Sequence, residues 1–472
     1  MLGMNWLLED IACILTTQLA IETEISVQRF VIDSRQVQAG DCFVALVGER
    51  VDGHLFLEAV QQAGAVAAIV THYQPECSLP QLLVSDAFEA LQRLAGIWRS
   101  QFVLMPCIAV TGSNGKTSVK EMIASILRVH ANNNVLATLG NLNNHLGLPL
   151  TLLALREENL CAVIEVGANH GGEIALLAPL VQPDTVVITS IGAAHIGEFG
   201  SLDAVVQAKG EILSALPEGG IAVLPVEGYN TVLSEWALWD AALQDKRVVA
   251  FGTLIDVQAC KQWQSYVGVA HRMQTGFGQT IDLVSSEWGH AQLYLPLLGE
   301  HQAHNLAAVA AALLPYGVSW LEIQAGLSHL LLPRGRLSVL QPIKGLLLID
   351  DSYNANPASM CAAIAVLMEQ QCQEHLLVVG TMGELGDNSQ ALHLTLADDA
   401  LSAGVDLLFA SGDYAQSMVA RFGGGLAADS PQVLADAIWQ RFLKTRSLAV
   451  LVKGSRSSRM ERVIEAICAL AA

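Results

Sequence analysis

A glycine-rich segment in the first half of the chain has the composition of a phosphate-binding loop. Thr111-Gly-Ser-Asn-Gly-Lys-Thr117 follows a β-branched run and precedes a helical pattern, which is the context that such loops require. Its backbone N–H groups would face phosphate oxygens at a helix N-terminus, Lys116 would reach the terminal phosphates, and the Thr117 hydroxyl would bind Mg²⁺. Because Val110 stands where the standard pattern has its first glycine, a purely structural glycine turn is the alternative. The residues expected to contact the nucleotide are Thr111, Gly112, Ser113, Asn114, Gly115, Lys116 and Thr117.

Three polar residues further along the same region could meet such a phosphate. Glu165 lies at the end of the apolar run Cys161–Val166, and a carboxylate at the C-terminal end of a strand in an open α/β sheet lies where ligands bind. It could hold Mg²⁺ directly or through water, or it could be a polar strand terminus. His195 follows the run Thr185–Thr189, but a lone histidine is more typical of a structural residue. Lys209 has the pattern of a solvated lysine on a helix.

Two further signals lie near the expected boundary between the second and third domains. Asn305 precedes an apolar run and could hydrogen-bond a base edge, although the residues alone favour a helix cap. Arg334 and Arg336 flank Gly335. An arginine there could reach across a cleft to a phosphate in transfer, as a forked donor does, or it could be a surface charge on a linker.

The last region has a polar segment, Asp350–Met360, between a strand pattern and a helical one. Asn356 followed by Pro357 has the signature of an N-cap and first helical residue, which is structural. The other polar side chains are costly for a plain turn, so we interpret them as ligand candidates. A basic run, Lys453–Arg459, follows the last strand pattern, and three bases there favour contact with an anion. The ligand candidates are Asp350, Asp351, Tyr353 and Asn354.

The elements that must position these residues follow an alternation of short β-branched runs and longer helical patterns, which is typical of parallel sheets with crossover helices. The alternation predicts three α/β domains: a smaller N-terminal domain over 1–104, a central P-loop domain with a parallel sheet over 105–333, and a C-terminal Rossmann-like domain over 334–472. Antiparallel strands are one interpretation of the less regular part, Tyr229–Leu298. The expected strands are Cys42–Leu46, Ala65–Val70, Cys107–Thr111, Cys161–Val166, Thr185–Thr189, Ile221–Leu224, Leu346–Asp350, Leu376–Gly380, Val405–Ala410 and Leu448–Val452.

Composition narrows the classes of protein that this chain can be. It has 472 residues, 52% of them hydrophobic and 15% charged, which is typical of a well-packed globular protein. Its 45 acidic and 25 basic residues give a formal net charge of −20. This balance argues against a nucleic-acid binder and against docking on an anionic membrane, since both need a basic face. Anionic ligands must therefore be held by a few well-placed cations, backbone N–H groups or metal ions.

Cysteine usage and hydropathy predict a cytoplasmic protein. The nine cysteines are scattered and include no Cys-x-x-Cys pair, which indicates a reducing compartment with neither a disulfide framework nor a zinc knuckle. Met1–Cys13 carries two acids and no base, unlike a secretory signal. In the uncharged stretch His301–Leu321 the unbroken apolar run extends only from Leu306 to Leu314, which predicts a buried helix and no stable membrane insertion.

Taken together, these motifs resemble the ATP-dependent Mur ligases of bacterial cell-wall synthesis, and the resemblance covers nearly the whole chain. The phosphate loop of that superfamily, which includes the folylpolyglutamate synthetases, has a short glycine spacing, so Val110 is no objection. Ser352–Pro357 is the specific signal, because it is similar to the members that attach D-alanyl-D-alanine, whereas sister ligases typically carry a histidine-bearing loop there. The other matching segments are Asp33–Arg35, Phe43–His54, Thr111–Thr117, Gly140–Asn144, Gly147–Leu153, Glu165–His170, His195–Ser201, Ala208–Glu211 and Lys453–Glu461.

The resemblance implies roles that the residues alone do not. Lys209 aligns with a lysine that the family carries as a carbamate, which is an anionic oxygen ligand for Mg²⁺, as a free ammonium could not be. His195 becomes a ligand of the same ion, while Thr117 and Glu165 would hold metal at the β- and γ-phosphates. The implied nucleotide contacts are Asn305 to adenine, Asp351 to the ribose and Arg336 to the γ-phosphate. The implied substrate contacts are Ser34, Arg35, Asp52 and His54 at the uridine-diphosphate end and Asn143 and Asn144 in the central cleft, with Tyr353 and Asn354 as candidates in the third domain.

The implied reaction joins D-alanyl-D-alanine to UDP-N-acetylmuramoyl tripeptide through an acyl phosphate, with ATP and two Mg²⁺ ions. The expected catalytic residues are Lys116, Lys209, His195 and Arg336, without a protein nucleophile, and the third domain is expected to close on ATP. We expect a monomer. The alternatives are a sister ligase or folylpolyglutamate synthetase-like enzyme that adds another amino acid, a nucleotide-binding protein without catalysis, and a P-loop kinase.

Overall fold

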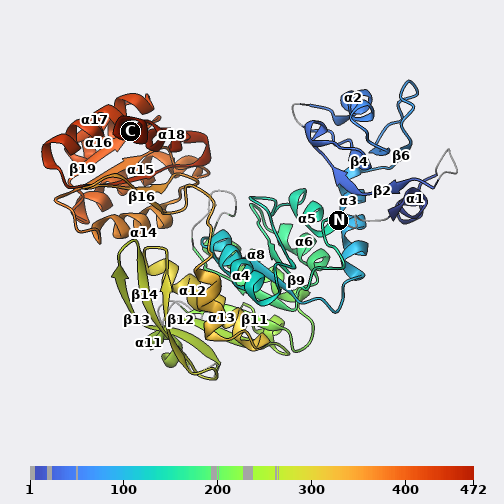
Figure 1. Ribbon diagram of the computed structural model, residues 1–472, viewed down its shortest axis with the longest axis horizontal. Helices are drawn as coiled ribbons and strands as arrows, with labels where there is room; N and C mark the ends of the chain where they lie inside the picture. The colour runs from blue at the N-terminus through green and yellow to red at the C-terminus, as the bar shows by residue number, and fades with distance from the viewer. Residues whose placement is uncertain are drawn as a thin grey trace.

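The computed structural model of the chain describes residues 6–18, 24–48, 51–192, 199, 201–226, 238–260, 263 and 265–472. These residues form three α/β domains in chain order, and the central domain lies between the other two (Figure 1). The predicted three-domain α/β fold is confirmed, and each predicted strand overlaps an observed one. The domain boundaries at 104 and 333 stay predictions.

The N-terminal domain has a four-stranded parallel sheet in the order β3-β4-β5-β6 and a two-stranded antiparallel sheet. β4 and β5 are buried along their whole length, as their continuous apolar runs predicted. The other strands are too short to give a hydrophobic pattern. The elements are β1 (Trp6–Leu7), α1 (Leu8–Leu15), β2 (Ser26–Val27), β3 (Arg29–Val31), β4 (Asp41–Val44), α2 (Leu57–Gln62), β5 (Ala67–Val70), β6 (Gln81–Leu83) and α3 (Ala87–Ser100), with 3-10 turns at Ser34–Gln36 and Gly53–Phe56.

The central domain has a nine-stranded sheet in the order β15-β14-β13-β12-β11-β10-β7-β9-β8. The strands from β8 to β13 in this order are parallel, and β13, β14 and β15 form an antiparallel edge, so the antiparallel interpretation holds for that part of Tyr229–Leu298. The strands are β7 (Cys107–Thr111), β8 (Val135–Ala137), β9 (Cys161–Glu165), β10 (Thr185–Ile188), β11 (Ile221–Val226), β12 (Arg247–Thr253), β13 (Tyr266–Thr275), β14 (Gly278–Ser285) and β15 (His290–Leu295).

Helices cover both faces of the central sheet. Alternate residues of β7 point to opposite faces, so Cys107 and Ala109 pack in the core shared with α3, α5 and α6, whereas Ile108 and Val110 pack against α4 and α12. Helix α12 is buried almost all round, as predicted. No helix in the described part of the chain is long and apolar enough to cross a membrane. The helices are α4 (Lys116–His130), α5 (Gly147–Leu153), α6 (Glu173–Val181), α8 (Leu202–Gly210), α10 (Asp240–Leu243), α11 (Leu254–Ala259), α12 (Glu300–Leu313) and α13 (Trp320–Leu327), with 3-10 turns at Glu211–Ala215 and Leu314–Tyr316.

Arg99 connects the N-terminal domain to the central domain through hydrogen bonds. It lies near the end of α3 and is 1% exposed, and its guanidinium donates to the backbone oxygens of Val181 and Gln182, both at 2.9 Å. These carbonyls lie at the end of α6, where unpaired acceptors and the helix dipole favour a cation. The Trp98 indole also donates to the Leu155 oxygen at 3.1 Å. Buried polar contacts as well as packing therefore hold the two domains together.

The C-terminal domain has a six-stranded sheet in the order β16-β17-β21-β18-β19-β20, parallel except for β16 at one edge. Sequence reasoning missed β16 and β20, because these short edge strands are mostly half-exposed and lack a continuous apolar run. The strands are β16 (Ser338–Ile343), β17 (Leu346–Asp351), β18 (Glu374–Val379), β19 (Leu407–Ala410), β20 (Gly425–Ala427) and β21 (Leu448–Lys453). The helices are α14 (Pro357–Met368), α15 (Ser389–Ser402), α16 (Ala415–Phe422), α17 (Pro431–Thr445) and α18 (Glu461–Ala471), with 3-10 turns at Gly386–Asn388 and Arg456–Ser458.

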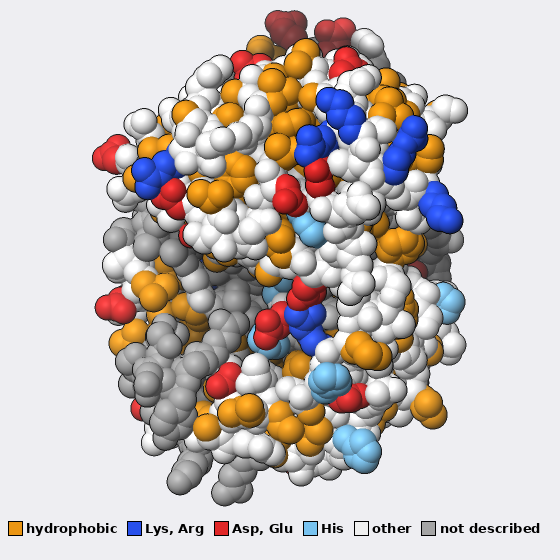
Figure 2. Space-filling model, turned by 90° about the vertical axis from the view of Figure 1, so that its left-hand side faces the viewer, with side chains coloured by type: hydrophobic (Ala, Val, Ile, Leu, Met, Phe, Trp, Pro, Cys, Tyr) orange, Lys and Arg blue, Asp and Glu red, His pale blue; other side chains and the backbone are white. Residues whose placement is uncertain are grey.

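Charged side chains of both signs are mixed on the side of the molecule that faces the viewer in Figure 2. Several Lys and Arg side chains lie near one another in the upper part of this view, with acidic and hydrophobic side chains among them. The described residues on this side therefore form no continuous basic band.

Candidate active site

The carboxyl ends of three neighbouring central strands meet at one edge of the sheet. β7 lies between β10 and β9, and the polar loops that follow these strands line a cavity of about 670 Å³. Other parts of its wall come from residues 351–363 and Lys453 of the C-terminal domain and from the linker residues 335–337. An open α/β sheet binds ligands at this edge. Of the predicted site residues, the cavity is lined by Ser113, Asn114, Gly115, Lys116, Thr117, Asn143, Asn144, Glu165, Asn305, Arg336, Asp351, Tyr353 and Asn354.

Two glycines with positive φ give the phosphate loop its shape. Gly112, at φ 139°, passes so close to Thr189 that a Cβ atom would lie 2.2 Å from the threonine hydroxyl. Gly115, at φ 80°, is the N-cap of α4, and a Cβ atom there would lie 2.5 Å from Oδ1 of Asn305. Both positions therefore require glycine, for the space as well as for the backbone conformation.

Strand β7 supports the start of this loop. Val110, the departure from the standard glycine pattern, is a fully buried residue of β7 paired with Glu165 of β9, so it lies before the loop and does not shape it. Thr111 is also buried, and its hydroxyl donates to the Val166 oxygen at 2.8 Å. The side chain of Thr111 thus ties β7 to the chain after β9 and does not face the cavity.

Lys116 folds back over the loop. Its ammonium donates to the backbone oxygens of Gly112 at 2.7 Å and Ser113 at 3.2 Å. Burial lowers the pKa of Lys116, the carboxylate of Glu165 opposes this shift, and Arg336 adds to it. The loop thus holds a half-buried cation beside the backbone N–H groups of a helix N-terminus, which is the chemistry that a polyphosphate needs.

Glu165 and Thr117 form a cluster of hard oxygen ligands beside the loop. The Thr117 hydroxyl lies 3.0 Å from Oε2 of Glu165, and the Asn143 amide donates to Oε1 at 2.8 Å. The backbone N–H of Glu165 donates to the Thr138 hydroxyl at 2.9 Å, which fixes the end of the strand. Glu165 is 2% exposed and these side-chain donors are neutral. A buried carboxylate with a hydroxyl beside it suits Mg²⁺.

Lys209 is a buried residue, and the interpretation of a solvated helix lysine is wrong. It is 2% exposed in the last turn of α8. Its nitrogen lies 3.4 Å from the Ala168 oxygen and 5.2 Å from the ring centre of Phe199. Burial lowers the pKa of Lys209 to about 7, helped by Lys116 and opposed by nearby carboxylates. His195, the other predicted ligand of this metal, lies outside the described residues.

Asn305 is not a helix cap, which corrects the interpretation that the residues alone favoured. Helix α12 begins at Glu300, with Gly299 as its N-cap, so Asn305 lies in the second turn. It is buried, its amide donates to Oε1 of Gln302 at 3.1 Å, and its Oδ1 lies against Gly115. The early polar residues of the helix concealed its start, because they break the apolar pattern.

The two linker arginines differ in their environment. Arg334 is exposed, as a linker charge would be, whereas Arg336 lines the cavity. The Arg336 guanidinium lies 4.3 Å from the ring centre of Tyr353, and its buried Nε has no hydrogen-bond partner among the described residues. An unpaired buried donor that faces a cavity is a candidate for an anionic ligand.

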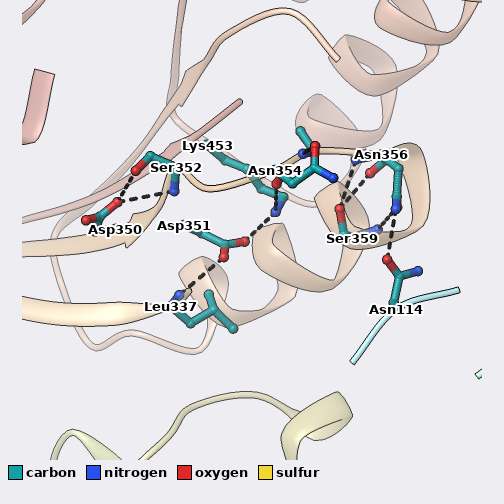
Figure 3. Close-up of polar contacts among 10 residues, drawn as sticks. Asn114, Leu337, Asp350, Asp351, Ser352, Asn354, Asn356, Ser359 and Lys453 are labelled. Atoms are coloured by element: carbon teal, nitrogen blue, oxygen red, sulfur yellow. Dashed lines mark hydrogen bonds and ion pairs between the residues drawn. The ribbon is translucent and has the colours of Figure 1, made fainter. Parts of the chain in front are cut away.

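The polar segment that begins at the end of β17 has two parts with different tasks. Asp350 is turned into the domain, where it accepts hydrogen bonds from the hydroxyl and backbone N–H of Ser352, so it is structural and not a ligand. Asp351 lines the cavity and accepts hydrogen bonds from the Lys453 ammonium at 2.5 Å and from the Leu337 backbone N–H at 3.2 Å (Figure 3). Burial raises the pKa of Asp351, and the charge of Lys453 opposes this shift.

Sequence reasoning missed two residues of this site. Asn356 is the N-cap of α14, as predicted, but its amide also donates to Oδ1 of Asn114 at 2.8 Å, across the domain interface (Figure 3). Lys453 was visible only as part of a basic run that favoured contact with an anion. The anion beside Lys453 is the chain's own Asp351, and Arg456 likewise pairs with Glu461 at 3.1 Å. A cap signature and a charge run do not reveal partners this far away in the sequence.

The four predicted residues of the N-terminal domain do not line the cavity. Arg35 is exposed and pairs with Asp33 at 2.9 Å. His54 is buried, with Nδ1 2.6 Å from Asp52 and Nε2 accepting the Thr71 backbone N–H at 3.0 Å, so both ring nitrogens are engaged. The uridine-diphosphate role of these residues stays a prediction. The four are Ser34, Arg35, Asp52 and His54.

Known proteins match this chain along its whole length. Residues 27–98 match the Mur ligase family, catalytic domain; residues 110–313 match the Mur ligase middle domain; and residues 335–456 match the Mur ligase, glutamate ligase domain. The UDP-N-acetylmuramoyl-tripeptide–D-alanyl-D-alanine ligase of Escherichia coli is 38% identical over 447 residues, 94% of either chain. Among solved structures, MurF from Acinetobacter baumannii has a TM-score of 0.88 and 33% identity, covering 99% of both chains. MurF from Thermotoga maritima in complex with ADP has a TM-score of 0.79 and 27% identity, covering 94% of this chain and 97% of that one.

Proposed function

The chain belongs to the Mur ligase family, and from this premise we propose that it joins D-alanyl-D-alanine to UDP-N-acetylmuramoyl tripeptide, with conversion of ATP to ADP and phosphate. The observation that carries this proposal is the 38% identity to a ligase of that name over 94% of both chains. The cavity between the phosphate loop and the C-terminal domain supports it, because ligation needs a nucleotide and two further substrates in one enclosed place. The product supplies the pentapeptide precursor of peptidoglycan.

The reaction proceeds in two steps through an acyl phosphate. The terminal carboxylate of the tripeptide attacks the γ-phosphorus of ATP, the bond to the bridging oxygen breaks, and ADP leaves. The amine of D-alanyl-D-alanine then attacks the acyl carbon, loses a proton and expels phosphate. Two anions approach each other in the first step, so Lys116 and Arg336 act by neutralising the charge that develops on the γ-phosphate. Both side chains are half-buried at the cavity, where water screens their charge less than on an open surface.

Thr117 and Glu165 would hold Mg²⁺ at the β- and γ-phosphates, and the oxygen character and burial of this pair fit the ion. When bound, the metal supplies positive charge against the phosphate oxygens. The side chains themselves orient one another: Asn143 holds Oε1 of Glu165, and the Thr138 hydroxyl holds its backbone. We include His195 and Lys209 as ligands of a second ion on the basis of the family resemblance.

Lys209 serves in this proposal as a carbamate. Burial against Phe199 and the lowered pKa, about 7, leave a large share of the amine neutral near neutral pH, and the neutral amine is the form that adds carbon dioxide. The nitrogen attacks the carbon of CO₂ and a proton is released. The anionic oxygens of the carbamate then suit Mg²⁺, whereas an ammonium would repel it.

The remaining predicted contacts divide among the three domains, with boundaries at 104 and 333. Asn305 lies beside the phosphate loop, where it would meet adenine, and Asp351 lies across the cavity, where it would meet the ribose. Asn143 and Asn144 would contact the peptide end of the nucleotide substrate, and Tyr353 and Asn354 the incoming dipeptide side. The uridine-diphosphate end is assigned to Ser34, Arg35, Asp52 and His54 of the N-terminal domain. The scattered cysteines of the sequence, which include no Cys-x-x-Cys pair, support a cytoplasmic location, where the nucleotide substrates are available.

One assay tests the function and its alternatives. ADP release is measured with ATP, Mg²⁺ and UDP-N-acetylmuramoyl tripeptide, with and without D-alanyl-D-alanine. Sustained release that requires both substrates is expected. A kinase would sustain release without the dipeptide, and a non-catalytic nucleotide-binding protein would release none. A sister ligase or folylpolyglutamate synthetase would reject the dipeptide and accept another amino acid.

Lys116→Met should abolish release, and Lys444→Met, at an exposed position of α17, is the matched control.

A further inference from the structure

Lys453, which has no step in the reaction above, is a buried lysine at the end of β21. It is 3% exposed, and its ammonium donates to Oδ2 of Asp351 at 2.5 Å and to the backbone oxygen of Asn354 at 2.8 Å (Figure 3). Parallel pairing of β17 and β21 places Lys453 opposite Asp351, so the sheet itself sets this ion pair. A buried ammonium is costly without such partners, and the loss of one partner leaves the other charge uncompensated.

The other oxygen of Asp351 fixes the linker between the central and C-terminal domains. Oδ1 accepts the backbone N–H of Leu337 at 3.2 Å. Leu337 has φ 54°, a conformation that leucine rarely adopts, so the surroundings must hold it there. Two residues earlier, the oxygen of Gly335 accepts the backbone N–H of Tyr353 at 3.0 Å. Residues 335–337 are thus bound at both ends, to the last residue of β17 and to the loop that follows it.

Arg336 lies between these two anchors. Its guanidinium stacks on Tyr353, 4.3 Å from the ring centre, and its buried Nε has no partner in the part of the chain that the structure describes. These contacts all come from the C-terminal domain. Although Arg336 precedes the first strand of that domain, Asp351 and Tyr353, which hold it and its two neighbours, lie at the end of β17 and just after it.

From these contacts we propose that Lys453 is a positioning residue for Arg336. By pairing with Asp351 it fixes the acceptor for the Leu337 N–H, and so it sets the direction in which the Arg336 guanidinium meets the γ-phosphate of ATP. Lys453 touches no substrate in this assignment. The inference rests on the function proposed above, because it takes the γ-phosphate as the ligand of Arg336. It also means that Arg336 moves with the C-terminal domain.

Nucleotide binding tests this relationship without reference to turnover. The affinities of ADP and of a non-hydrolysable ATP analogue are measured with Mg²⁺ for the full-length protein, for Lys453→Met and for Arg336→Ala. Lys453→Met keeps most of the aliphatic stem and removes the charge. Asp351, which would also meet the ribose of both nucleotides, loses its partner in this variant, so ADP and the analogue should share one loss. Because Arg336 would meet only the γ-phosphate, the analogue should lose about tenfold more affinity than ADP does in Lys453→Met. The double variant should have the same ratio of analogue affinity to ADP affinity as Arg336→Ala alone. Lys444→Met, at an exposed position of the same domain, should match the wild type.

Three results would overturn the proposal. Equal weakening of ADP and the analogue would mean a general structural role, and additive losses in the double variant would mean that Lys453 acts independently of Arg336. A rise in KM for D-alanyl-D-alanine with unchanged nucleotide binding would place Lys453 on the dipeptide. If Lys453→Met shows no cooperative thermal unfolding, Lys453→Arg replaces it; the planar fork cannot occupy the same point between Asp351 and Asn354, so an analogue-selective loss is again expected. If the wild type itself binds neither nucleotide, the proposed function fails instead.

Discussion

The side-chain amide of Asn356 donates to Oδ1 of Asn114 at 2.8 Å, so the residue that starts α14 also holds the phosphate loop. Away from the loop, Arg272 of β13 pairs with Glu369 at the end of α14. The same helix is therefore attached to the central domain near both of its ends. The C-terminal domain contacts the loop directly through this arrangement.

Replacement of Asn356 separates its two tasks. Serine is as good an N-cap as asparagine but has no amide to reach Asn114, whereas alanine loses both contacts. We expect Asn356→Ser to keep its free energy of unfolding within about 0.5 kcal/mol and to lose about three- to tenfold in kcat/KM for ATP. Asn356→Ala should lose the same activity and about 1 kcal/mol of stability.

The measurements are urea unfolding and steady-state ADP release. Ser430→Ala, at the N-cap of α17, is a control that removes a cap without touching the cavity. Asn114→Ala should reproduce the kinetic loss without the loss of the cap. If Asn356→Ser were as active as the wild type, the bond between the domains would have no part in catalysis.

The glycine at position 112 is expected to tolerate no side chain. In Gly112→Ala the new Cβ would clash with the Thr189 hydroxyl, and φ 139° is a conformation that alanine avoids. The loop must move to accept it, so nucleotide affinity should fall at least about tenfold while the fold survives. Isothermal titration with ADP and far-UV circular dichroism measure the two quantities. Gly424→Ala, where nothing lies within 4 Å of the new Cβ, should leave both unchanged; a similar loss there would show that any added methyl group is harmful.

The parts of the fold that the sequence predicted share one property. Strands such as β7 and β21 are buried on both faces, so continuous apolar runs signal them, and the loops after them carry polar residues that the core cannot use. Edge strands such as β16 and β20 lack that pattern because one side meets solvent. The phosphate loop was equally predictable, because glycine, lysine and threonine are each required there by local geometry.

Contacts that depend on tertiary packing were not predictable in this way. Lys209 has a solvated pattern in the sequence because its burial comes from packing that local periodicity does not record, Phe199 included. The cap signature at Asn356 correctly predicts the N-cap of α14, but it gives no sign of the hydrogen bond that the same side chain makes to the central domain. The partners of Lys453 are set by strand order in the sheet, which a list of strands does not contain. Long-range pairing therefore decides the tasks of these three residues.

Lys209→Ala is expected to abolish ligation and to be partly rescued by a short carboxylic acid. The acid would place a carboxylate in the space of the missing side chain and restore an anionic oxygen ligand for Mg²⁺. Lys209→Arg, which cannot form a carbamate, should be inactive and should not be rescued, because its side chain fills that space. ADP release with increasing acetate is the measurement, and Lys444→Ala is the control. Full activity in the unrescued alanine variant would exclude a carbamate at this position.

Glu322 should make stability depend on pH in the acid range. It closes a capping box at the start of α13, accepts the Ser319 hydroxyl at 2.6 Å and lies 2.7 Å from Nδ1 of His130, and these contacts lower its pKa from 4.5 to about 2. Since the folded pKa lies below the unfolded one, the native state binds fewer protons, so the stabilisation is present above about pH 4.5 and is lost as the pH falls toward 2. Glu322→Gln should therefore lower the free energy of unfolding near neutral pH. The loss should be less than about 1 kcal/mol, because the side chain is partly exposed and solvent screens its charge. The difference in free energy of unfolding from the wild type should shrink by about pH 3. Urea unfolding at both pH values measures it, with Glu218→Gln in an exposed turn as the control. A difference that stayed constant with pH would assign the effect to side-chain packing, because packing does not titrate.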